Sequence, residues 1–164
     1  MFWAGKGFLP TPKLLLTAEA ESEYREWLRQ LPKAELAIRE DYTFWAPGAA
    51  LGASYNPVSS LVIKGKAGFE YTVSPANATV GNPNGQVPAP NVTLALGNHP
   101  LWQAEGGADW AITRAIHTYA DAAYSRFGFG RSADFYYDNG NKSEYEPSSV
   151  THLTKLQLGL AWSF

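Results

Sequence analysis

The chain has 164 residues, enough for one domain with a core of its own. Its formal charge of −2 argues against a nucleic-acid partner, which needs a basic face, and the absence of cysteine excludes a disulfide framework. Aromatic residues make up 14% and glycine accounts for 15 residues, a combination expected where strands pack closely and rings line a membrane interface. No apolar run approaches the roughly 18–20 residues of a membrane-spanning helix, whereas membrane strands escape that test because their alternate residues can be polar.

Residues 1–33 are predicted to form an amino-terminal arm followed by an amphipathic helix over residues 17–31. An apolar stripe recurs at i, i+3, i+4 and i+7 along this segment, which is typical of a helix. Its members are Tyr24, Trp27, Leu28 and Leu31. Thr17 can cap the start and Pro32 ends the pattern. Either an interfacial or plugging helix, or an ordinary helix packed on its neighbours, fits this segment.

From residue 34 to residue 164 the period changes to two, which predicts strands. Five are expected, over residues 36–55, 60–73, 92–112, 116–130 and 151–164. In the first of them the apolar phase changes at Pro47–Gly48, which predicts a bulge or kink.

The alternation assigns side chains to two faces of the predicted sheet. We expect a set of apolar residues on the outside of a curved sheet, facing lipid: Ile63, Phe69, Tyr71, Trp110, Leu158, Leu160 and Trp162. We expect a set of charged residues to share the interior: Lys64, Lys66, Glu70, Glu105, Asp109, Asp121 and Lys155. Opposite charges in a narrow interior should pair, giving a plugged lumen instead of an open pore.

The predicted connections differ in length. Asn56–Ser59 and Thr113–Ala115 read as tight turns, whereas Pro75–Asn91 and Arg131–Ser149 are long segments rich in turn-forming residues. Short turns at one end and long loops at the other are typical of outer-membrane barrels.

The final segment, Leu156–Phe164, alternates strictly between large apolar residues and polar or small ones and stops on the aromatic Phe164. It resembles the terminal strand of bacterial outer-membrane β-barrels, where such an ending serves as an assembly signal. The predicted fold is therefore all-β: an antiparallel transmembrane β-barrel with one amino-terminal helix, in the outer membrane of a Gram-negative bacterium. Because the start of the sequence lacks the apolar segment of a secretory leader, we expect a mature chain, a truncated one, or one piece of a larger polypeptide.

Four further stretches between residue 36 and the end resemble the carboxy-terminal half of the omptins, which are ten-stranded outer-membrane proteases. They are PGAALGASY, KAGFEY, TYADAAYSR and YYDNGNKSEY. The resemblance implies an Asp–His pair in the loop that corresponds to Pro75–Asn91, and an Asp pair from the amino-terminal half. That loop contains neither Asp nor His, so there is no general base for hydrolysis of this kind, and no catalytic residue is assigned.

No other site chemistry is predicted. His99, His117 and His152 are scattered without metal-ligand spacing, so we assign no metal site and no cofactor. Five strands cannot close a membrane barrel, since the smallest single-chain examples use eight. We therefore expect two partners: the lipid bilayer, and another chain or a missing amino-terminal half that completes the barrel.

Three functions fit this pattern. The first is a non-enzymatic outer-membrane β-barrel protein with a structural, adhesive or assembly role. The second is an omptin-type protease half that lacks its partner half. The third is a soluble β-barrel that binds an apolar ligand.

Overall fold

The computed structural model describes residues 2–31, 38–81, 92–137 and 142–162, and every regular element in this part of the chain is a β-strand. No helix in these ranges is long and apolar enough to cross a membrane. The prediction of an all-β, antiparallel fold is confirmed, and the prediction of an amino-terminal helix is wrong.

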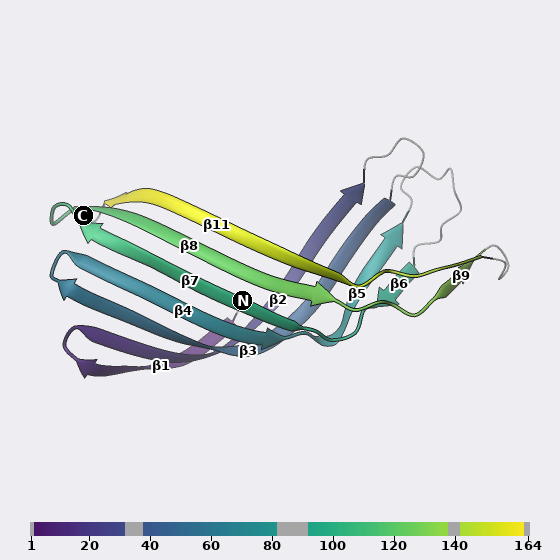
Figure 1. Cartoon of the computed structure of the whole chain (residues 1–164), viewed down its shortest axis with the longest axis horizontal. Helices are drawn as coiled ribbons and strands as arrows, with labels where there is room; N and C mark the ends of the chain where they lie inside the picture. Colours follow the sequence, from purple (N-terminus) through teal and green to yellow (C-terminus); the bar gives the residue numbers. More distant parts are fainter. Residues whose placement is uncertain (1, 32–37, 82–91, 138–141, 163–164) are drawn as a thin grey trace.

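Seven long strands lie side by side as one antiparallel meander (Figure 1). In sheet order they are β1 (Phe2–Thr11), β2 (Leu14–Leu31), β3 (Ile38–Val58), β4 (Leu61–Tyr71), β7 (Pro100–Ala111), β8 (Ile116–Phe129) and β11 (Ser149–Trp162). Two shorter strands, β5 (Val73–Gly81) and β6 (Val92–Ala95), continue the sheet from one end of β3. A separate hairpin is formed by β9 (Phe135–Tyr137) and β10 (Lys142–Glu144).

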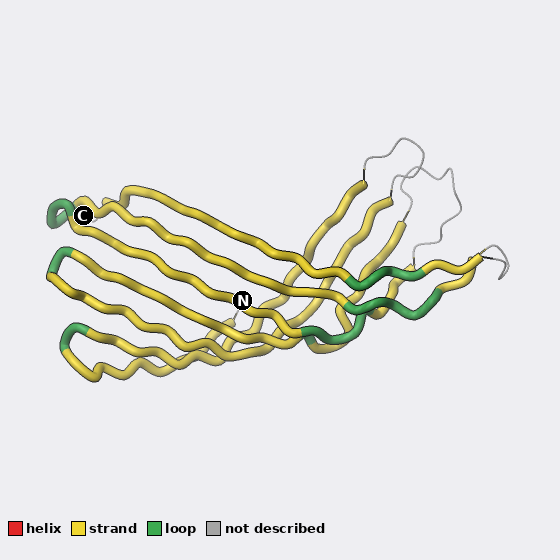
Figure 2. The backbone as a smooth tube through the Cα atoms, in the orientation of Figure 1, coloured by secondary structure: helices red, strands yellow, loops and turns green. Residues whose placement is uncertain are grey.

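The two ends of the sheet differ (Figure 2). At what we call the turn end, β1–β2, β3–β4 and β7–β8 are each joined by a short connection. At the opposite, extended end lie β5, β6 and the β9–β10 hairpin, and β2 and β3 bend away from β8 and β11 (Figure 1). Tight turns on one side and long connections on the other were expected, but the long connections contain short strands.

Residues 17–31, expected as a helix, belong to the 18-residue strand β2, which pairs with both β1 and β3. Ala, Glu and Leu favour helices, but two neighbouring strands satisfy the backbone N–H and C=O groups of β2 on both sides and override that preference. A period of two is also present in the sequence, since Glu19, Glu21 and Glu23 alternate with Ala18, Ala20 and Ser22.

The expected bulge at Pro47–Gly48 does not appear in the pairing of β3 with β2, whose register runs without a shift from Tyr55 to Ile38. On its other side β3 changes partner here, from β4 at Gly48 to β5 at Trp45. Pro47 has no N–H to donate and lies between these two partners. A register shift occurs nearby, between Thr43 and Trp45 in the pairing with β5, but the register with β2 is unbroken. The apolar phase of β3 therefore changes because the surroundings of the strand change.

The predicted strand over residues 92–112 divides into β6 and β7. Between them Gly97 has a φ of +73°, a left-handed conformation that favours glycine. The boundaries expected for β3, β4, β8 and β11 agree with the structure to within a few residues.

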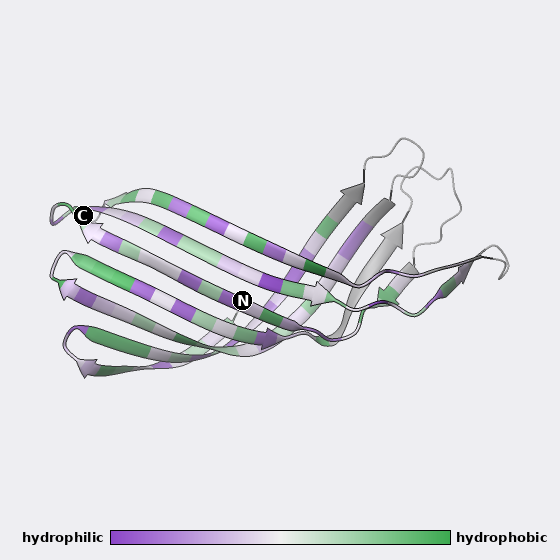
Figure 3. Cartoon of the chain, viewed as in Figure 1, coloured by the Kyte–Doolittle hydropathy of each residue, from purple (hydrophilic) through white to green (hydrophobic). Residues whose placement is uncertain are grey.

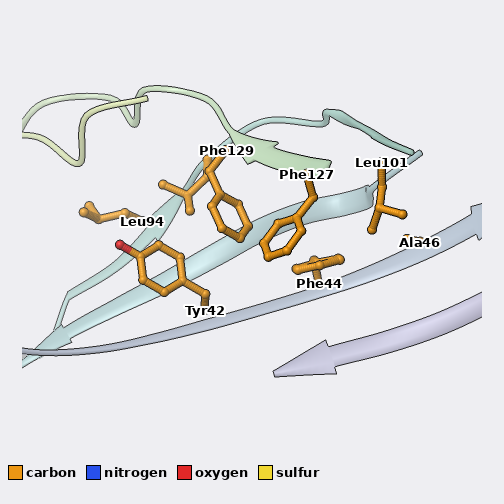
Figure 4. Packing of buried hydrophobic residues seen from close by; sticks show 8 residues of the cluster. Tyr42, Phe44, Ala46, Leu94, Leu101, Phe127 and Phe129 are labelled. Carbon is orange, nitrogen blue, oxygen red and sulfur yellow. The ribbon is translucent and has the colours of Figure 1, made fainter. Parts of the chain in front are cut away.

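The buried core lies on one face of the sheet at the extended end (Figure 4). Phe127 and Phe129 of β8 pack on Tyr42 and Phe44 of β3, with a ring-centroid distance of 4.9 Å between Tyr42 and Phe129. Trp27 of β2 also reaches Phe127, with centroids 5.4 Å apart. Since β4 and β7 separate β3 from β8 in the sheet, these contacts require the sheet to curl toward this face.

Candidate functional site: an apolar outer face and a charged inner face

The curled sheet has an inner, concave face that carries the core and an outer face that the register defines. Directly paired residues share a face, so one transverse row of outer positions can be followed across six strands. That row consists of Leu16, Ala53, Gly65, Gly106, Ala122 and Leu156.

The outer face is apolar and open. On β11, Leu156, Leu158 and Leu160 are 77%, 81% and 74% exposed. The seven apolar residues predicted to point outward, from Ile63 to Trp162, all lie on this face and are exposed. Along β4, β8 and β11, hydrophobic and hydrophilic residues alternate visibly (Figure 3).

Aromatic side chains form two bands across the outer face. The band near the extended end contains Tyr24, Trp45, Phe69, Tyr71, Trp102 and Tyr124. The band near the turn end contains Phe8, Tyr55, Trp110 and Trp162. Between the bands the residues are mostly small or aliphatic, as the transverse row above illustrates.

The separation of the two bands can be read from the strand length. Trp102 and Trp110 are eight residues apart in β7, or about 26 Å at the rise of a strand. A tilt of ~40° reduces this to about 20 Å in height, close to the ~25 Å apolar band of membrane barrels. Beyond the band at the extended end, polar residues appear on the outer face, where Glu26 pairs with Thr43 and Asp41 pairs with Leu28.

Lys6 is the charged exception between the bands. It lies on the outer face of β1, opposite Ala18. Its long aliphatic stem allows the ammonium group to reach a polar boundary while the stem stays on apolar surface.

The inner face carries the charges. The seven predicted interior residues, from Lys64 to Lys155, all share it. Lys66 Nζ lies 2.8 Å from Glu19 Oε2 and also contacts Glu21, whose other carboxylate oxygen accepts a hydrogen bond of 2.7 Å from Gln103. Elsewhere Lys64 Nζ lies 3.0 Å from Asp121 Oδ1. The expected pairing is confirmed for Lys64 and Asp121, whereas Lys66 pairs with Glu19 and Glu21, which lie outside the set of residues predicted for the interior.

Glycines make room for these long side chains. A Cβ on Gly48 would lie 2.2 Å from the Phe69 carbonyl oxygen and 2.6 Å from Cγ of Glu70. A Cβ on Gly107 would lie 2.0 Å from Asp121 Oδ1. In each case an acidic side chain from the neighbouring strand occupies the space that a Cβ would need. Glycine at these positions therefore allows the inner face to hold its carboxylates.

Glu70 is the most enclosed charge of the inner face. Its side chain is fully buried at 0% exposure, and neither carboxylate oxygen has a hydrogen-bond partner among the described residues. Glu21 and Glu23 lie close enough to repel it, and Arg25 and Lys66 close enough to attract it. Burying a carboxyl group without hydrogen bonds costs free energy, and the nearby positive charges of Arg25 and Lys66 offset part of that cost.

A cavity of about 440 Å³ opens on the inner face nearer the turn end. Lys64, Lys66, Glu105, Asp121 and Lys155 all line it. Its walls therefore carry both signs of charge and suit water or a polar occupant better than an apolar ligand.

At the extended end, the hydroxyl group of Tyr42 lies 2.9 Å from Oε2 of Glu40 and 2.6 Å from Oε1 of Glu146. Burial and the adjacent Glu146 raise the pKa of the Tyr42 phenol, which lies beyond the aromatic bands, so it remains a hydrogen-bond donor. The backbone carbonyl of Glu146 accepts a hydrogen bond from the N–H of Ser132, and the N–H of Glu146 donates one to the Ser132 hydroxyl group. These contacts tie β3 to the segments on both sides of the β9–β10 hairpin.

The three histidines do not gather. His117 pairs with Asp109 on the inner face at 2.8 Å, and His152 contacts the Tyr124 hydroxyl on the outer face at 2.7 Å. His99 lies in the connection before β7. Within the described ranges, no three His, Asp or Glu side chains lie close enough together to hold a metal ion.

The segment Pro75–Asn91, which corresponds to the catalytic loop of the omptins in the resemblance, lies outside the described residues from residue 82 onward, and its lack of Asp and His is a property of the sequence. The helix predicted for residues 17–31 does not place Glu19, Glu21 and Glu23 on the inner face, where the pairing of β2 with β3 brings them. Their alternation with small residues was the signal that could have found them.

No protein-family model and no characterised protein matches this sequence.

Proposed function

We propose that this chain is a non-enzymatic component of a bacterial outer-membrane β-barrel, with a structural, adhesive or assembly role. The observation that carries the proposal is the inverted distribution of polarity. The outer face is apolar and exposed, whereas the concave face holds the ion pairs. A protein that folds in water buries its apolar face, so this arrangement favours lipid as the surrounding solvent.

Two further observations support a membrane location. The aromatic bands are separated by about 20 Å, as interfacial girdles would require. Beyond the band at the extended end, the outer face carries polar residues such as Glu26, Asp41 and Thr43. The short turns would then face the periplasm and the extended end the exterior.

The barrel needs additional strands from another chain or from further sequence. β1 and β11 each have one edge that pairs with no other described strand. In hydrocarbon, every unsatisfied backbone group on such an edge costs several kcal/mol. We therefore propose two partners for this chain: the bilayer on its outer face and a strand-forming polypeptide at its edges.

The interior favours a barrel that is filled instead of conducting. Lys66 bridges two carboxylates and Gln103 extends the same network across the inner face. The segment Pro75–Asn91 contains neither Asp nor His, which supports a role without hydrolysis.

The test is the depth of two tryptophans in a bilayer. Two single-tryptophan variants, one retaining Trp162 and the other Trp27, are reconstituted in phosphatidylcholine vesicles with brominated acyl chains. Bromine should quench Trp162, which is 75% exposed on the outer face, much more strongly than Trp27, which packs on Phe127. Equal quenching, or a chain that folds in buffer without lipid or detergent, would overturn the membrane proposal.

A further inference from the structure

The directions of the two edge strands, β1 and β11, restrict which additional strands can close the described sheet into a barrel. Every neighbouring pair among the seven long strands is antiparallel. β1 is first and β11 is seventh in the sheet order, so both run in the same direction, toward the turn end (Figure 1).

This shared direction has a consequence for closure. If β1 paired directly with β11, the seam would be parallel, whether it joined the edges of one chain or of two copies arranged around a common barrel axis. Parallel pairing is slightly less stable per residue and usually requires a crossover connection. One inserted strand pairs antiparallel with both β1 and β11. Two inserted strands leave one of these pairings parallel, and three again make both pairings antiparallel.

We infer that the opening between β1 and β11 is filled by a polypeptide segment that supplies an odd number of antiparallel strands. This inference rests on the proposed function, because only a lipid environment requires every edge to be paired.

The side chains at the two edges describe the inserted strands further. On β11, Leu156, Leu158 and Leu160 require apolar outward-facing neighbours. Lys155 points to the inner face, lines the cavity and has no ion-pair partner in the described part of the chain. An inward-facing carboxylate on the strand beside β11 would complement it.

On its inner face, β1 carries two glycines and Trp3, which pairs with Glu21 and is 69% exposed. Gly5 and Gly7 occupy inner-face positions of β1 and project no side chain. A Cβ on Gly5 would lie 2.8 Å from Glu19 Cγ, so the side chain of Glu19 already occupies the space over Gly5. The segment is therefore expected to carry small or apolar residues outward and polar residues inward.

The test adds strands of this chain to its own amino terminus. Copies of residues 116–129, 100–129 and 61–129 contribute one, two and three long strands, and all three extensions end at Phe129 with the same linker to the full chain. The copy of β8 is suitable because this strand runs antiparallel to β11 and carries an inward-facing carboxylate, Asp121. Hydrogen exchange of the β11 amides is measured in phosphatidylcholine vesicles.

The one-strand and three-strand extensions should slow exchange of the edge-facing β11 amides by at least about tenfold. The two-strand extension should leave them as fast as in the unextended chain, and it is the matched control. Protection of β11 by two strands but not by one or three would overturn the odd-number rule, as would protection by none of them.

A second measurement does not depend on the extensions folding. In the unextended chain, Ala4→Cys and Leu158→Cys place one thiol on each edge strand. No disulfide should form between them under oxidising conditions. A disulfide within one chain would indicate direct closure, and one between chains would indicate a second copy; either result overturns the inference. Quenching of Trp162 by brominated lipid remains an independent readout, so failure of the odd-number rule is distinguishable from failure of the membrane proposal.

Discussion

Two kinds of contact link individual residues on the inner face. Glycines leave room for the side chains of neighbouring strands, and two carboxylates contact the same lysine. Lys66 holds Glu19 and Glu21, while Gly48 makes room for Glu70. Both arrangements place charged groups where water has limited access, so their removal should be felt more strongly than that of exposed pairs.

Replacing Lys66 by alanine should lower the free energy of unfolding by about 3 kcal/mol, because two partly buried carboxylates lose their common cation. The matched control is Lys64→Ala on the same strand and face, whose ion pair with Asp121 is more exposed and is worth at most ~1 kcal/mol. Urea unfolding in lipid vesicles measures both. Equal losses in the two variants would contradict the idea that Lys66 organises the network.

Gly48→Ala should destabilise the fold by about 1–3 kcal/mol, since its Cβ would meet the backbone oxygen of Phe69 at 2.2 Å. Gly65→Ala is the control, because the nearest atom to a Cβ there is the Glu105 oxygen at 3.8 Å. That variant should stay within about 0.5 kcal/mol of the parent. Thermal unfolding followed by circular dichroism separates the two, and a tolerated Gly48→Ala would show that β4 can shift locally.

At the scale of elements, β3 passes through two environments. Near the turn end its outward residues, such as Leu51 and Tyr55, are apolar. Near the extended end its inward residues, Tyr42 and Phe44, enter the core instead. One strand with an unbroken register to β2 therefore changes the face that carries its apolar side chains.

Tyr42→Phe should loosen the attachment of the segments around the β9–β10 hairpin, because it removes hydroxyl contacts with Glu40 and Glu146. We expect a loss of about 1–3 kcal/mol and faster hydrogen exchange at the amides of Ser132 and Glu146. Tyr136→Phe, at a side chain that is 68% exposed, should change neither quantity. Unchanged exchange at both amides in Tyr42→Phe would mean that the hydroxyl group does not hold these segments.

At the scale of the whole molecule, polarity is distributed by face. Neighbouring residues in β11 test this directly, because Leu158 points outward and Gln157 points inward, within hydrogen-bond distance of the Tyr119 hydroxyl.

Leu158→Arg should lower the free energy of unfolding in a bilayer by about 2–4 kcal/mol, whereas Gln157→Arg should cost much less. Folding efficiency into phosphatidylcholine vesicles, measured against urea, provides the comparison. If Leu158→Arg folded as well as the parent and Gln157→Arg did not, the two faces would be assigned the wrong way round.

The sequence by itself determined the all-β class, the boundaries of most strands and the division of side chains between two faces. These follow from a period of two, which is local and survives in any sheet. It did not determine the secondary structure of residues 17–31, because this segment fits both the helical period and the period of two. Pairing with β1 and β3 decides between a helix and a strand. The sequence also did not explain the change of apolar phase at Pro47. Residues before Pro47 point their apolar side chains inward because they pack on Phe127 and Phe129, which lie far away in the sequence. The same holds for the sharing of Lys66 between two glutamates: such contacts depend on which strands become neighbours, and strand order is a property of the folded sheet.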